Sequence, residues 1–184
     1  DDDFRLLTVL KRQPWPARGG VENFIEVRKL TMQDSSRNTR MWSKVETDTA
    51  YRELCRHIWD QIFDVPIPGM ETPADLQRVG NEQIDRAVKA VTKLQARGVP
   101  VLFVRPPSAD AYLRYEDRDF PRALTWDVLL QRTGVAGIHF QDYPELQGFT
   151  PPEWSHLSGA EAEKFTKRLC AILQRDFGWT ARAR

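Results

Sequence analysis

From residue 73 onward, the sequence alternates helical patterns with short apolar runs that are typical of β-strands. Apolar residues recur at helical spacing over 73–97 and again over 120–131. Two runs rich in β-formers, VPVLFV at 99–104 and VAGIHF at 135–140, predict strands. Such nearly continuous apolar runs fit strands that are covered on both faces. We therefore expect an α/β fold with parallel strands and helices on both sides of the sheet.

Two of the predicted helices carry clear end signals. Pro73 suits the first turn of one helix, and Gly98 suits its C-terminal stop. The last helix begins with S-G-A-E, a capping box in which the Ser158 side chain accepts from a free backbone N–H and Glu161 reaches back. The apolar face of this last helix consists of Phe165, Leu169, Ile172 and Leu173.

The turn-rich segment at 64–72, DVPIPGMET, divides the chain. Before it the pattern is helical and irregular, with helical spacing over 21–32 and a stronger helix over 49–63. The sequence thus predicts a helical segment or insertion at 1–70, followed by an α/β portion at 71–184.

Two strands are too few to form a stable sheet alone. An upstream segment outside this sequence, or a partner chain, is therefore expected to complete the sheet. The chain opens with three aspartates and has neither an initiator Met nor the basic and apolar regions of a signal peptide, which suggests a processed or truncated start.

Composition argues against several classes of function. Lys and Arg number 27 against 26 Asp and Glu, so we expect no nucleic-acid partner. No stretch approaches the roughly 20 apolar residues of a membrane span. Cys55 and Cys170 form no CxxC pair, so neither a metal site nor a redox dithiol is predicted. Each lies in an apolar helical pattern and is expected to be a buried free thiol, although a single disulfide stays open.

The segment Glu153-Trp154-Ser155-His156 contains the clearest candidates for chemistry. A histidine three residues after a carboxylate can share one side of a turn with it. The carboxylate of Glu153 can then hold one ring nitrogen of His156, fix its tautomer and support the imidazolium that forms when the ring takes a proton. The alternative is a histidine that only hydrogen-bonds the turn.

This block resembles the final conserved motif of the SGNH (GDSL-like) ester hydrolases and acyltransferases, D-x-x-H before a leucine and a helix start. The resemblance covers about 71–177 and includes VLFVRPP and GIHFQDYPEL, which are similar to the family's penultimate strands. It implies a three-layer parallel-sheet (SGNH or flavodoxin-like) fold, with His156 as general base and Glu153 in the position of the orienting Asp. It implies neither a cofactor nor a metal.

Further residues are candidates for substrate binding. Arg105 ends an apolar strand, where α/β folds place ligand-binding groups, although a salt bridge at the sheet rim is an equally good reading. Trp154 is a candidate for lining a pocket beside His156. Asp142 follows the second strand and could orient a histidine or simply form a turn. His139, within that strand, is expected to be a packed residue.

The family's serine-bearing start, a strand followed by G-D-S, is not visible, and the nearest imitation is Q-D-S-S at 33–36. One hypothesis is therefore an SGNH-type serine ester hydrolase or O-acyltransferase whose nucleophile lies upstream, acting on a small-molecule or carbohydrate ester. The other is a catalytically inactive binding or scaffold protein for a carbohydrate or a partner chain. The relatives that modify cell-envelope polysaccharides suggest a bacterial envelope or periplasmic location, which the residues themselves leave open.

Overall fold

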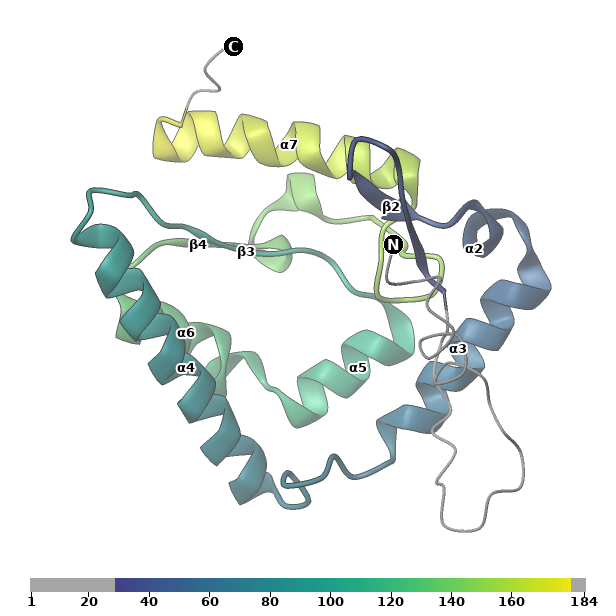
Figure 1. Ribbon diagram of the computed structural model, residues 1–184, viewed down its shortest axis with the longest axis horizontal. Coiled ribbons are helices and arrows are strands. Elements are labelled where there is room, and N and C mark those ends of the chain that lie inside the picture. Colours follow the sequence, from purple (N-terminus) through teal and green to yellow (C-terminus); the bar gives the residue numbers. More distant parts are fainter. Residues whose placement is uncertain (1–28, 180–184) are drawn as a thin grey trace.

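Two short parallel strands lie between helices in the computed structural model, which describes residues 29–179 (Figure 1). In chain order, the helices and strands are β1 (Thr31–Gln33), β2 (Thr39–Met41), α2 (Ser43–Thr47), α3 (Thr49–Phe63), α4 (Pro73–Gln95), β3 (Phe103–Arg105), α5 (Asp110–Asp119), η2 (Arg122–Leu124), α6 (Trp126–Thr133), β4 (Gly137–His139), η3 (Phe140–Asp142), η4 (Pro144–Leu146) and α7 (Gly159–Phe177). The expectation of a mixed α/β chain is confirmed.

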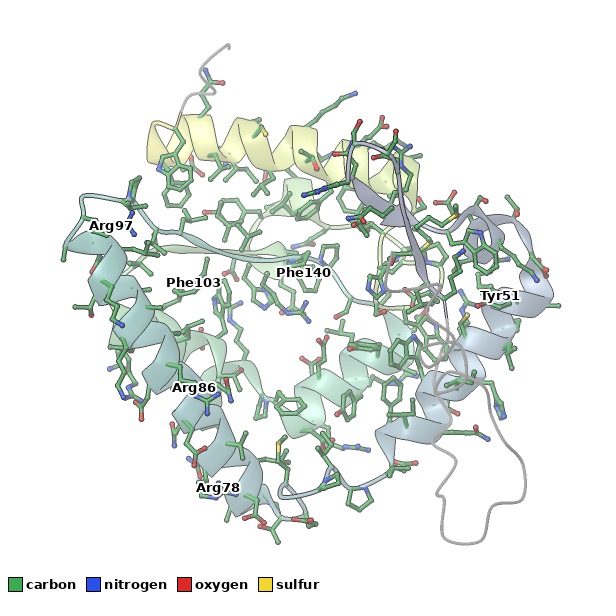
Figure 2. The ribbon with its side chains drawn as sticks, in the orientation of Figure 1. Tyr51, Arg78, Arg86, Arg97, Phe103 and Phe140 are labelled. Atoms are coloured by element: carbon green, nitrogen blue, oxygen red, sulfur yellow. The ribbon has the colours of Figure 1, made fainter. Side chains whose placement is uncertain are left out.

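The strands β3 and β4 pair in parallel, with Val104 opposite Ile138. Helix α7 covers one side of this pair, while α4 and α6 pack together on the other (Figure 1). Figure 2 shows α4 running along one flank, from Arg78 near its start to Arg97 just beyond its end. The main buried cluster joins the β4 region to α7 and consists of Ile138, Phe140, Leu146, Phe165 and Ile172.

Local capping explains why the best-predicted helices begin where they do. Thr72 and Asp75 form a reciprocal capping box on α4, with Pro73 in its first turn. On α7, the Ser158 hydroxyl accepts from the Glu161 N–H, as predicted. The Glu161 carboxylate instead accepts from the Thr150 N–H, so it fixes the preceding loop rather than closing the box.

The predicted helix over 21–32 is wrong at its end, and its residues up to 28 lie outside the described part. Thr31–Gln33 forms strand β1, which pairs antiparallel with β2. The Asp34 carboxylate accepts from the backbone N–H groups of Ser36 and Asn38 and so closes the hairpin turn. The Q-D-S-S segment is therefore a hairpin turn that follows a strand.

The predicted strand over 99–104 is longer than the paired strand β3. Pro100 has no N–H to donate, and the Val99 N–H bonds to the carbonyl of Leu94 at the end of α4. Pairing with β4 therefore begins only at Phe103, whose N–H donates to the Ala136 carbonyl.

The predicted helix over 120–131 is also revised. Pro121 precedes the short helix η2, and α6 begins only at Trp126. The Thr125 hydroxyl bonds to the carbonyls of Phe120 and Pro121, which ends the first turn before α6 starts. Helix α5 was not predicted.

The cysteines differ from each other in burial. Cys55 is buried on α3, as predicted, whereas Cys170 is exposed on α7, so that prediction is wrong. Both are free thiols.

Gly137 allows α6 to lie close against β4. A Cβ atom at this position would stand 2.6 Å from a ring carbon of Trp126 and 2.8 Å from a methyl carbon of Leu130. Real Cβ atoms essentially never come this close to such atoms, so any larger residue forces the Trp126 and Leu130 side chains, or the helix that carries them, to shift.

We expect Gly137→Ala to lower the free energy of unfolding by about 1–3 kcal/mol, because it overpacks the contact between β4 and α6. Urea unfolding followed by circular dichroism measures this change. Gly80→Ala is the matched control, since a Cβ at Gly80 on α4 meets no atom within 4 Å. The control should be neutral or gain up to about 1 kcal/mol. Equal stability of the two variants would contradict the packing account.

Candidate active site

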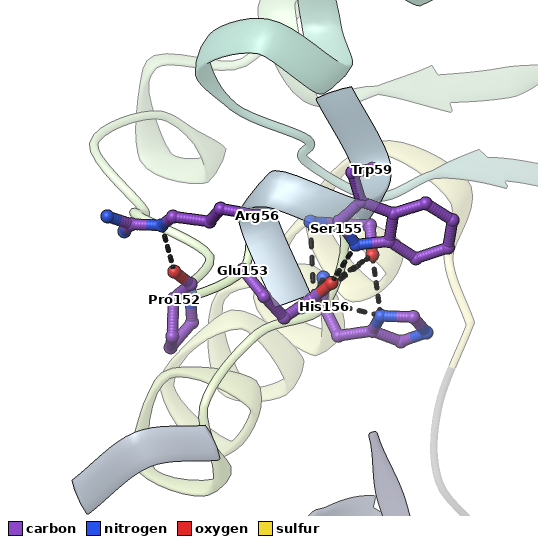
Figure 3. Close-up of polar contacts among 6 residues, drawn as sticks. All are labelled: Arg56, Trp59, Pro152, Glu153, Ser155 and His156. Carbon is purple, nitrogen blue, oxygen red and sulfur yellow. Dashed lines mark hydrogen bonds and ion pairs between the residues drawn. The ribbon is translucent and has the colours of Figure 1, made fainter. Parts of the chain in front are cut away.

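Residues 153–156 form a tight loop that leads into α7 and is held by two other segments. From α3, the Arg56 Nε donates to the Pro152 carbonyl at 2.9 Å (Figure 3). From the segment after β3, the Ala109 N–H donates to the Trp154 carbonyl at 2.9 Å. Trp154 has a φ of 76°, a left-handed conformation that non-glycine residues rarely adopt. At this sharp turn the side chains of Glu153 and His156 contact each other, as the sequence predicted.

The Glu153 carboxylate is completely buried, yet both of its oxygens accept hydrogen bonds. The indole N–H of Trp59 donates to Oε2 at 2.7 Å. The backbone N–H of His156 donates to Oε1 at 2.6 Å, and the Ser155 hydroxyl lies 2.7 Å from Oε2. A buried carboxylate without such donors would be strongly destabilising. The donors therefore make this position possible for a charged group.

His156 faces the carboxylate with Nδ1 and the surroundings with Nε2. Its Nδ1 lies 3.0 Å from Oε1 of Glu153 and 2.7 Å from the Ser155 hydroxyl (Figure 3). Because the carboxylate can only accept, Nδ1 carries the proton, and Nε2 of the neutral ring keeps a free lone pair. No residue in the described range 29–179 bonds to Nε2, and the side chain is 47% exposed. The arrangement presents a proton acceptor outward.

The hydrogen bond that Nδ1 of His156 donates to Glu153 raises the pKa of His156 above the ordinary histidine value, while partial burial opposes the shift. A negative carboxylate stabilises the imidazolium more than the neutral ring, which explains the direction. This is the electrostatic support that a general base needs when it takes a proton.

The other predicted site residues lie in two places. Trp154 is half-buried next to His156, and the Arg56 guanidinium lies 5.6 Å from the centre of its ring. Arg105 ends β3 and forms a salt bridge with Glu116 of α5, which is the second of the two roles considered for it from the sequence. Asp142, beyond β4, is held by both terminal nitrogens of Arg122 at 2.6 and 2.8 Å. Neither Arg105 nor Asp142 bonds to His156.

Sequence reasoning missed two residues of the site, Trp59 and Ser155. Trp59 lies beside the apolar stripe that predicted α3, so it resembled an ordinary packing residue. A Trp that is partly buried usually needs a partner for its N–H, which was the available signal. Ser155 contacts both Glu153 and His156 and so belongs to the same hydrogen-bond network.

Comparisons with protein-family models, with curated proteins and with solved structures found no match to this chain. Within residues 29–179, no group of three or more His, Cys, Asp or Glu side chains is arranged to hold a metal ion. No helix in that same range is long and apolar enough to cross a membrane. The site therefore has to be interpreted from its own geometry.

We expect Glu153→Gln to lower the pKa of His156, since the amide removes the negative charge that stabilises the imidazolium while burial still opposes it. Titration of the ring resonances by NMR measures the shift. The resonances of His57, which is exposed on α3, provide the internal control and should be unaffected by the substitution. An unaltered His156 titration would show that Glu153 does not govern this ring.

Proposed function

We propose that residues 71–184 are the histidine-bearing portion of an SGNH-type serine ester hydrolase or O-acyltransferase, with that family's three-layer parallel-sheet fold. The observation that carries this proposal is the 3.0 Å contact between the buried Glu153 carboxylate and Nδ1 of His156. It leaves Nε2, the nitrogen that must take the proton, pointing away from the carboxylate (Figure 3). This is the relation between orienting acid and base that acyl transfer to a serine requires.

In the proposed reaction, a serine hydroxyl attacks the acyl carbonyl of an ester while Nε2 of His156 accepts its proton. The Glu153 carboxylate stabilises the resulting imidazolium through Nδ1–H. The imidazolium then returns the proton to the departing alcohol oxygen, which leaves an acyl-serine. A water molecule, or the hydroxyl of an acceptor, then attacks the acyl carbon while Nε2 of His156 accepts its proton. The bond to the serine oxygen breaks, that oxygen takes the proton back from the imidazolium, and the acyl group leaves as a carboxylic acid or as a new ester.

Glu153 is one methylene longer than the aspartate of the resembled motif. Here the longer side chain still reaches Nδ1, because the donors Trp59 and Ser155 hold the carboxylate in place. The departure from the family pattern is thus compatible with the same role.

Ser155 is not the proposed nucleophile, although its hydroxyl lies 2.7 Å from the ring. It contacts Nδ1, the nitrogen already occupied by Glu153, and it also bonds to the carboxylate oxygens. We assign it a positioning role. The nucleophile is proposed to be supplied by chain outside residues 1–184, in the family's strand-and-serine block.

The proposed substrate is a small-molecule or carbohydrate ester. Trp154 is the proposed contact for a sugar or acyl group, because its half-buried ring belongs to the loop that carries His156. Arg105 and Asp142 are weaker candidates for this substrate, since each is already paired with an oppositely charged side chain. An envelope location would suit a polysaccharide ester.

A serine-directed fluorophosphonate probe and p-nitrophenyl acetate test the proposal on protein made from its complete reading frame. We expect labelling and hydrolysis, and we expect His156→Gln to reduce hydrolysis by about 100-fold or more because the base is lost. His57→Gln is the matched control on exposed surface and should retain activity. Ser155→Ala should still be labelled.

Full hydrolysis by His156→Gln would contradict the proposal. The proposal would also be contradicted if the folded complete protein showed no labelling and no turnover. That result would favour the binding or scaffold hypothesis instead.

The dependence of kcat/KM on pH tests the role of the raised histidine pKa. The base works only as the neutral ring, so kcat/KM should rise with pH and level off above the pKa of His156. Because Glu153 raises that pKa, the midpoint should lie above about 6.5, the ordinary histidine value. Glu153→Gln should move the midpoint to lower pH. A midpoint that is the same in both proteins would assign the titration to another group.

A further inference from the structure

A second feature of the molecule lies apart from the histidine loop. A cavity of about 540 Å³ opens between helices α4, α5 and α6 and the end of β4. Its walls are mainly apolar and include Val79, Ile84, Leu113, Phe120 and Leu129. None of residues 151–156 lines it. The volume falls within the range of pockets that take small organic ligands, about 300–1,000 Å³.

One polar side chain in this wall has a ring N–H donor with no partner in the described part of the chain. His139 is only 6% exposed, and its ring stacks on Phe140 with centres 5.1 Å apart. Its Nδ1 accepts the Gln141 N–H at 3.3 Å, so in the neutral ring Nε2 carries the proton. Burial lowers the pKa of His139, which favours that neutral ring.

The Nε2–H group of His139 has no hydrogen-bond partner within residues 29–179. Yet no side-chain nitrogen or oxygen that is fully buried in this part of the chain lacks a partner. His139 lines the cavity, so Nε2 is the ring atom that we take to face a ligand there. A buried polar group that opens onto an apolar pocket is a specific place for a ligand's acceptor atom.

The charges in the wall restrict the ligand further. Arg105 is paired with Glu116, and Arg122 is paired with Asp142, so neither guanidinium is left over for an anion. Asp117 adds a negative charge to the lining. An anionic ligand would therefore find no unpaired cation in the described wall, whereas a neutral ligand needs none.

We propose that this cavity binds a neutral, mainly hydrocarbon molecule, aryl or acyl in character, whose carbonyl oxygen accepts a hydrogen bond from Nε2 of His139. The apolar walls of α4, α5 and α6 enclose the hydrocarbon part. The site is independent of the proposed ester chemistry at His156, and its test requires no catalytic activity.

A neutral naphthyl ketone, 6-propionyl-2-dimethylaminonaphthalene, is a suitable probe because its emission shifts to the blue in apolar surroundings. We expect saturable binding to protein made from the complete reading frame. Gly80 lies on α4 in the cavity wall with open space at its Cβ position, so Gly80→Leu should fill the cavity. This variant should weaken binding by about tenfold or more, as the probe and the leucine compete for one space.

Lys89→Leu is the matched control, since it adds the same side chain to an exposed position of α4 that does not line the cavity. It should bind like the unchanged chain. Thermal unfolding checks that both variants are folded, and Gly80→Leu is expected to be at least as stable as the unchanged chain because leucine favours helix over glycine. Absence of saturable binding to the folded chain, or equal binding by the two leucine variants, would overturn the proposal.

His139→Phe tests the polar contact, because phenylalanine keeps a ring against Phe140 and removes the donor. We expect the ketone to bind roughly two- to tenfold more weakly, the usual worth of one hydrogen bond. Binding of the same naphthalene without its ketone should not change. Equal losses for both compounds, or no loss for the ketone, would overturn the assignment of Nε2 as the donor.

Discussion

The buried carboxylate of Glu153 is the group on which the histidine loop depends. A charge removed from water is tolerated only when its hydrogen-bonding capacity is satisfied. Here the donors come from the loop itself, through Ser155 and His156, and from α3, through Trp59. In the sequence, helix α3 precedes the turn-rich segment 64–72, whereas the histidine loop follows it. The N-terminal segment therefore contributes directly to the candidate site, which includes residues from both sides of the division near residue 70.

Two histidines in this fold illustrate how surroundings set chemistry. His156 has a carboxylate on Nδ1, a raised pKa and an outward Nε2, which suits proton transfer. His139 accepts a backbone N–H on Nδ1 and is buried against aromatic rings, which lowers its pKa and suits hydrogen-bond donation by a neutral ring. The same side chain thus supports two different proposals, because Nδ1 faces a hydrogen-bond acceptor in His156 and a hydrogen-bond donor in His139.

The sequence predicted features that local residues determine and missed those that depend on tertiary contacts. Helices α3, α4 and α7 were found because apolar spacing, and for α4 and α7 capping residues, act within a few positions of each other. The pairing of Glu153 with His156 was predicted for the same reason. Strand limits were not, since pairing depends on a distant partner, and α5 was missed because its sequence, DAYLRYEDRD, is largely charged. Trp59 was missed because it lies 94 residues from Glu153.

The strand that we expect to complete the sheet and the nucleophile that we propose would meet one structural requirement rather than two. Within residues 29–179, β3 pairs only with β4, and Val104 of β3 is 37% exposed. A parallel strand added to its open edge would end on the same side of the sheet as Arg105. From that side the chain after β3 runs directly to the histidine loop, where the Ala109 N–H bonds to the Trp154 carbonyl. In the resembled family, the serine follows such a strand. Here that serine would therefore lie at the same end of the sheet as Arg105, the end from which the chain continues to the loop of His156.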